Sequence, residues 1–178
     1  MTTEALRRLN DSEHGEIWNR FQAAFDFRPD TSVIPGISEP ASSVTWSLGA
    51  LDDDPGYRKL DRLVGVVQDG LARCCRPGEA LWLLDQPHAS YRLRPDLVPD
   101  GAATPRVVEG QPWQGWPLSP YPDGNHSVQL AEDFRFGVFG HPSEKSLCVF
   151  GTELLDAIAD EVDGLLPQVI RRDGKPVG

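Results

Sequence analysis

The sequence contains no long apolar run. Its apolar stretches, such as residues 81–84, fall far short of the ~20 residues that a membrane-spanning helix needs. Residues 1–8 also lack the apolar segment that a secretory signal peptide carries. We therefore expect neither a membrane span nor a signal peptide.

Cysteine is scarce. The chain has three, Cys74, Cys75 and Cys148. An odd count with two adjacent members does not fit a disulfide framework, and no Cys-x-x-Cys spacing suggests a zinc site. Free thiols persist in a reducing compartment. The pattern predicts a cytoplasmic protein with reduced cysteines.

Basic residues are outnumbered, with 17 Lys and Arg against 27 Asp and Glu and a net charge of −10. Such a charge opposes non-specific attraction to nucleic acid or to an anionic membrane. We expect neither as a partner. A protein partner or a small-molecule ligand stays open.

The motifs that mark common active sites are missing as well. We find no Gly-x-Ser-x-Gly, no His-x-x-x-His, no Asp-x-Asp-x-Asp-Gly and no glycine-rich phosphate loop before a helix. A metal site would have to be assembled by the fold from His88, His126, His141 and Asp133. We expect no metal and no cofactor.

What the sequence does contain is clear periodicity. Apolar residues recur at helical spacing over residues 12–25, 57–71 and 153–163. Runs typical of β-strands lie between these segments. They cover residues 44–48, 79–84, 91–93, 128–131, 134–139 and 147–150. The last three runs, separated by short turns, predict a meander that carries the main core.

Helices near the ends and strands between them predict an α+β fold. We expect one domain over residues 1–170, with an antiparallel sheet of about five or six strands and helices packed on one face. Residues 94–122 hold seven prolines and two tryptophans, which favours an ordered loop packed on the body over a plain linker. Residues 171–178 are expected to form a flexible tail.

Several blocks of the chain resemble a bacterial family of unknown function that is common in actinomycetes. The most specific block is Asp133-Phe134-x-x-Gly137-x-Phe139-Gly140-His141-Pro142, followed by Leu147-Cys148-Val149-Phe150-Gly151. Two further blocks are Leu84-Asp85-x-x-His88-x-x-Tyr91-x-x-x-Pro95 and Trp18-x-x-Phe21. Together they span residues 15–160. Members of that family usually carry aromatic residues near position 127 and a Trp after the His-Pro pair, where this chain has Asn125-His126-Ser127 and Ser143. The resemblance implies no activity.

Two histidines stand out as chemical candidates. His141 lies in a Gly-His-Pro turn with Glu144 three residues on, and could act as a general base or ligand. The alternative is that its ring bonds the carbonyls of the turn. Asp85 and His88 follow a buried strand, where a carboxylate could orient an imidazole, although no nucleophile accompanies them. Alternatively, these two residues only close the turn.

Other residues are candidates for binding a ligand or partner. Arg135 could bind a carboxylate or phosphate, or pair with Asp133 or Glu132, and Asp133 is a second candidate beside it. Trp113 and Trp116 could line a partner surface or cover the core. Tyr91 and Glu144 stand near the two histidine loops and complete this set.

Two functions therefore remain open. The first is a small acidic binding or interaction module, for example an immunity-type inhibitor, which acts through loops near His88 and His141 and is steered to a basic partner by its charge. The second is a small enzyme that uses His141, His88 and Asp85 as acid–base groups. Each histidine follows a strand, so if those strands run parallel, the two loops lie at the same end of the sheet and could form one site.

Overall fold

The computed structural model describes residues 4–98 and 116–178. Three α-helices occur in these ranges: α1 (Asp11–Phe25), α2 (Arg58–Cys74) and α3 (Thr152–Leu165). The first five strands are β1 (Leu6–Arg8), β2 (Ser43–Ser47), β3 (Leu81–Leu84), β4 (Tyr91–Leu93) and β5 (Ser127–Ala131). The other four are β6 (Gly137–His141), β7 (Ser146–Phe150), β8 (Val169–Arg172) and β9 (Lys175–Pro176). None of these helices is long and apolar enough to cross a membrane.

The described strands form one antiparallel sheet of nine strands, in the order β1-β4-β3-β5-β6-β7-β2-β8-β9. A mixed helix and sheet fold with an antiparallel sheet is therefore confirmed, but the expected number of five or six strands is wrong. The missed strands, β1, β8 and β9, lie at the two edges. They have two to four residues each and are half-buried or exposed, so they lack the apolar alternation that predicts a strand.

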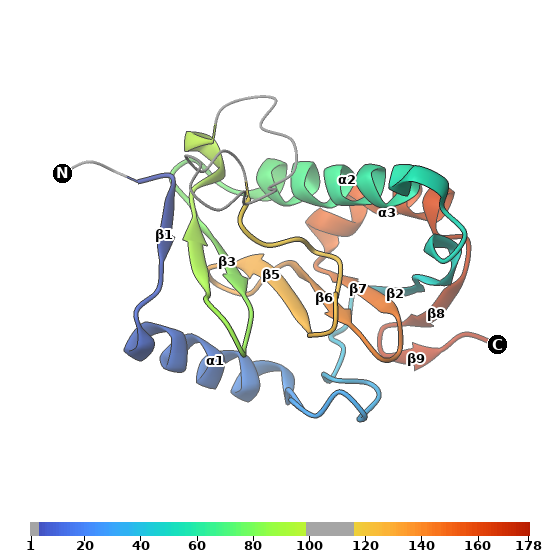
Figure 1. Ribbon diagram of the computed structural model, residues 1–178, viewed down its shortest axis with the longest axis horizontal. Helices are drawn as coiled ribbons and strands as arrows, with labels where there is room; N and C mark the ends of the chain where they lie inside the picture. Colours follow the sequence, from blue (N-terminus) through green and yellow to red (C-terminus); the bar gives the residue numbers. More distant parts are fainter. Residues whose placement is uncertain (1–3, 99–115) are drawn as a thin grey trace.

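Helices cover both faces of the sheet, and the expectation of helices on one face is wrong. Figure 1 shows α1 on one side of the strands and α2 with α3 on the other. Strand β7 shows why both sides need cover. Leu147 and Val149 pack with α2 and α3, whereas Cys148 and Phe150 pack with α1. Strands buried on both faces need an apolar layer on each side.

The start of α1 is fixed by its own sequence. The side chain of Asn10 accepts a hydrogen bond from the backbone N–H of Glu13, at 2.9 Å, and the Glu13 carboxylate accepts one from the backbone N–H of Asn10, at 3.0 Å. This capping box satisfies two N–H groups that the helix leaves unpaired. Ile17, Trp18 and Phe21 then face the sheet and are buried.

Helices α2 and α3 pack against each other at a glycine. A Cβ atom on Gly70 would lie only 2.3 Å from Cγ2 of Ile158, so only glycine permits the observed approach of the two helices. Val67 and Leu71 on α2 meet Leu154 and Ile158 on α3 within one apolar cluster. This helical layer covers the face of the sheet opposite α1.

The C-terminal segment forms part of the sheet, although its sequence predicts a flexible tail from residue 171. Strand β8 pairs with β2 and then turns back into β9. Arg171 anchors it, with Nη2 lying 2.8 Å from Oε1 of Glu39 and 2.6 Å from Oε1 of Glu144. The three side chains are 3–13% exposed. Ion pairs this well buried and hydrogen-bonded hold their segments in register.

We predict that both apolar layers are needed for stability. Phe136 is fully buried in the layer under α2 and α3, and Phe150 is 2% exposed in the layer under α1. Truncating either ring to Ala should lower the free energy of unfolding by about 3–5 kcal/mol, measured by urea denaturation. Tyr57→Ala, at a ring that is 67% exposed, is the control and should change it by less than about 0.5 kcal/mol. A loss below about 1 kcal/mol at both Phe sites would contradict this assignment of the core.

Candidate functional site

The chain topology brings two of the predicted loops to one end of the sheet. Strands β3 and β6 are both antiparallel to β5, which lies between them. The two strands therefore run in the same direction and finish at the same end. Leu84 at the end of β3 pairs with Val128, and Gly140 near the end of β6 pairs with Ser127. The start of β5 thus lies between the loops that carry His88 and His141.

His141 is bound into the fold at both of its ring nitrogens. It is the last residue of β6, paired with Ser146, rather than part of the turn. The ring is 1% exposed. Nε2 lies 2.8 Å from the carbonyl oxygen of Val33, and Nδ1 lies 3.2 Å from the backbone nitrogen of Glu144. The first contact suits a donor at Nε2 and the second an acceptor at Nδ1, so both ring nitrogens are engaged within the protein.

Asp85 and His88 form a pair at the surface. Nδ1 of His88 lies 3.1 Å from Oδ2 of Asp85, and the side chains are 67% and 20% exposed respectively. The backbone N–H of Asp85 donates to the hydroxyl of Ser90, which fixes the turn after β3. The other carboxylate oxygen of Asp85, Oδ1, is buried and has no hydrogen-bond partner among the described residues.

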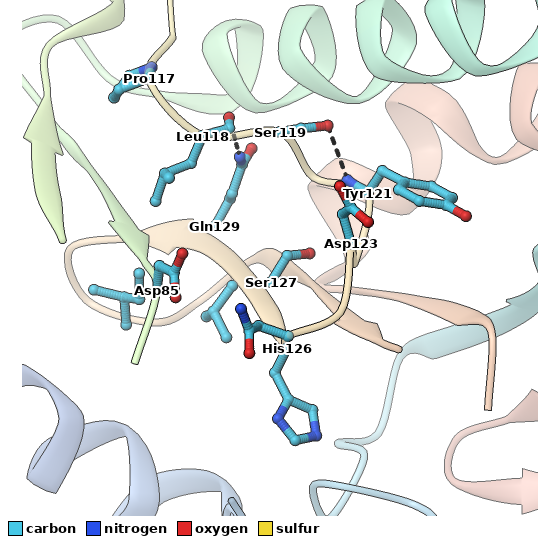
Figure 2. Close-up of a pocket in the computed structure, with 12 residues that line it drawn as sticks. Asp85, Pro117, Leu118, Ser119, Tyr121, Asp123, His126, Ser127 and Gln129 are labelled. Carbon is cyan, nitrogen blue, oxygen red and sulfur yellow. Dashed lines mark hydrogen bonds between the residues drawn. The ribbon is translucent and has the colours of Figure 1, made fainter. Parts of the chain in front are cut away.

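Beside Asp85 lies a pocket of about 180 Å³, drawn in Figure 2. It forms where residues 117–125 cross the ends of β3 and β5. Its apolar lining comes from Leu84, Pro117, Leu118, Tyr121 and Val128. Its polar lining comes from Asp85, Ser119, Asp123, Asn125, His126, Ser127 and Gln129. No Lys or Arg is among these described lining residues, so the formal charges of the pocket are two carboxylates.

Gln129 is the functional candidate that sequence reasoning missed. It lies in the middle of β5 and is 1% exposed. Its Nε2 donates to the carbonyl oxygen of Leu118 at 2.8 Å, the bond that Figure 2 draws as a dashed line. A flipped amide would place oxygen against oxygen, so this bond sets the orientation. Oε1 then has no partner within the described ranges. The available signal was a glutamine inside an otherwise apolar strand run.

His126 borders the pocket, but its ring turns to the α1 side of the sheet. Figure 2 shows the ring pointing away from Gln129. It stacks on Phe139 at 5.4 Å between ring centroids and meets the edge of His141 at 4.9 Å. Burial, with the neighbouring His141, lowers the pKa of His126 to about 4. The ring is therefore neutral at pH 7, and its Nε2 is buried with no hydrogen-bond partner in the described part of the chain.

Two of the predicted binding residues lie at the opposite end of the β5–β6 hairpin. Arg135 donates to Glu79 and to Asp133, and its Nη2 lies 3.1 Å from the carbonyl oxygen of Cys74 at the end of α2. The hydrogen bond to Glu79 raises the pKa of Arg135. These contacts engage the guanidinium within the protein and tie α2 to the hairpin turn.

The remaining predicted binding residues are held by the body of the protein. Glu144 bonds Arg171, and Trp116 is 5% exposed within the layer under α2 and α3. Tyr91 is half-buried against the same layer. Trp113 lies outside the described residues. Of the predicted acid–base and binding residues that the structure describes, Asp85 lines the pocket, and His126, named above as a possible metal ligand, borders it as well.

Within the ranges that the structure describes, no three His, Cys, Asp or Glu side chains gather as a metal site requires. His126 and His141 touch, but Asp133 lies at the other end of β5 and β6. All three cysteines are free thiols. Burial raises the pKa of Cys75 and of Cys148 to about 12, which makes them poor nucleophiles because the thiolate is the reactive form.

We predict a pH dependence of stability that comes from His126. Its pKa is about 4 in the folded protein, against an ordinary value of 6.5, so the unfolded chain takes up a proton first as the pH falls. Stability is therefore full above pH 6.5 and is lost as the pH falls towards 4. At 1.36 kcal/mol per pKa unit the loss is up to about 3 kcal/mol.

The variant His126→Phe should remove this component, since a ring of similar size still stacks on Phe139 and cannot titrate. Urea denaturation of both proteins from about pH 7.5 to about pH 4 gives the comparison. Carboxylates that lose stability in acid are common to the two proteins and cancel in the difference. Parallel stability curves would contradict the assignment.

Comparisons with known proteins found a relative and a family, neither of which has a described chemistry. Uncharacterized protein YxiI of Bacillus subtilis (strain 168) is 22% identical over 159 residues, which cover 87% of this chain and 93% of that protein. No solved structure matches. A family model described as "Protein of unknown function (DUF2716)" matches residues 8–155. The resemblance to a family of unknown function is confirmed at this level, while the signature blocks and the link to actinomycetes stay predictions. Because the match spans most of the chain, this protein belongs to the DUF2716 family of proteins of unknown function.

Proposed function

We propose that this protein is a binding module, for example an immunity-type inhibitor of a basic protein, that acts through the loops at the end of β3 and the start of β5. The observation that supports this most is the pocket beside Asp85. Its formal charges are two carboxylates, and two of its lining residues, Asp85 and Gln129, each have a buried acceptor atom with no partner among the described residues. Unpaired buried acceptors are costly for stability alone, which favours a role in binding.

The acidic character of the chain supports a basic partner. The net charge is −10, and Asp85 and Asp123 place two of the carboxylates at the pocket. Complementary charge raises association rates and suppresses wrong partners, with a strong dependence on salt. The same charge disfavours nucleic acid and anionic membranes as partners. We propose a cytoplasmic location, in which the three thiols stay reduced.

An enzyme remains the second candidate, and one contact favours it. Asp85 and His88 lie 3.1 Å apart, and His88 is largely exposed, so a carboxylate-oriented imidazole faces solvent. His141, however, uses both ring nitrogens within the protein. Acid–base chemistry would therefore rest on the Asp85–His88 pair alone. This is the weaker case because it rests on that one contact.

We predict that the tagged protein captures a basic protein partner from a lysate of its source organism, and that capture depends on the pocket carboxylates. The double variant Asp85→Asn with Asp123→Asn should lose the partner at low salt, because two attractive charges are removed from the contact. Mass spectrometry of the captured proteins is the measurement, repeated at increasing salt.

The matched control is Asp61→Asn with Asp69→Asn, which removes the same charge from exposed positions on α2. The control should keep the partner. If the two double variants capture the same proteins, the loops are not the binding surface. If the wild type turns over a metabolite and His88→Gln does not, the enzyme hypothesis replaces the hypothesis of a binding module.

A further inference from the structure

We infer that the pocket beside Asp85 binds a compact organic cation, a guanidinium or primary ammonium group. This inference rests on the binding role proposed above and names the chemistry that the site recognises. The same group could be a free small molecule or a side chain of a protein partner, and the experiment below separates these sources.

Two buried oxygen atoms call for a ligand that donates hydrogen bonds. Oδ1 of Asp85 and Oε1 of Gln129 are both acceptors, and both lack a partner among the described residues. The orientation of both side chains is fixed by other bonds, because His88 contacts Oδ2 of Asp85 and the carbonyl oxygen of Leu118 accepts from Nε2 of Gln129. A ligand that satisfies both atoms must therefore donate hydrogen bonds.

The charge of the pocket selects a cation among possible donors. Asp85 and Asp123 contribute two carboxylates, and the described lining includes no Lys or Arg. His126 adds no positive charge, since its pKa is about 4 and its ring turns away from Gln129. Anionic ligands are repelled here, whereas a guanidinium or ammonium group would form charge-assisted hydrogen bonds with the carboxylates.

The size of the pocket fits an organic group better than a single ordered water. A water needs only about 10–15 Å³ of such volume, against about 180 Å³ here. Pro117, Leu118 and Tyr121 line part of the wall and offer apolar contact for a short carbon chain. A cationic head with a small aliphatic body therefore matches both parts of the lining.

Unpartnered polar atoms alone do not identify this site. Among the described side chains, Trp18, Gln68 and Arg135 each have one as well. None of these three residues lines the pocket. The pocket differs because two residues with such atoms, Asp85 and Gln129, come from adjacent strand segments and line the same cavity.

The test is a ligand titration of the ¹⁵N-labelled full chain, followed by NMR. The probes are methylguanidinium and n-butylammonium, with methylurea and n-butanol as neutral counterparts of similar shape. Saturable shifts are expected for the cations alone, at the side-chain amide of Gln129 and the backbone amides of residues 85 and 123. Asp85→Asn should weaken cation binding about tenfold, because it removes the charge from one hydrogen-bond acceptor.

Asp61→Asn on α2 removes one charge at a distance and should leave the affinity unchanged. Thermal unfolding of both variants establishes that they are folded. A second arm uses capped tripeptides with a central Lys or Arg. Tighter binding of these peptides than of the free cations assigns the pocket to a partner side chain, and the reverse order assigns it to a free small molecule.

Three outcomes would overturn the inference: neutral counterparts that bind as well as the cations, shifts that do not saturate, or equal affinities of wild type and Asp85→Asn. These outcomes are distinct from failure of the proposed function. A partner that is captured through the loops while no cation enters the pocket would leave the binding module intact and remove only this assignment.

Discussion

The central strands of the sheet are buried on both faces, and the rest of the molecule is arranged to meet that condition. Every residue of β6 and β7 is buried. Helix α1 covers one face, and the α2–α3 pair covers the other (Figure 1). Residues 116–126 cross the second face near the start of β5, where Gln129 bonds Leu118. The pocket lies beside this crossing segment, which supplies Pro117, Leu118 and Ser119 to its lining.

The buried polar residues of this protein differ in how completely their hydrogen bonds are made. His141 and Arg171 lie inside the protein with their hydrogen bonds made, and each joins segments far apart in the chain. Their loss would leave partners unpaired, which is the ordinary reason for a buried polar residue to be retained. Asp85 and Gln129 are different. Each is held by one atom and has another buried atom with no partner in the described residues, and both residues line the same pocket.

Part of the candidate site could be predicted from the sequence. Asp85 and His88 follow a strand and stand in a turn, and the structure places them there as a contacting pair. His141 and Glu144 were chosen by the same logic, yet the first lies within β6 and the second bonds Arg171. Their partners, Val33 and Arg171, are far away in the chain. No local pattern shows that such a residue is already engaged, because the engagement is a tertiary contact.

The sequence by itself determined the three helices and the central strands, because each buries a stripe or face whose period is written locally in the apolar residues. A local signal also marks the start of α1, where the side chain of Asn10 caps the helix. Only the tertiary structure decided that both faces of the sheet are covered and that β1, β8 and β9 extend it. It also decided that Gln129 and Asp85 line the same pocket. The reason is that strand pairing and the covering of a face are contacts between distant segments. Period-two alternation tells which residues share a face, but not what lies against it.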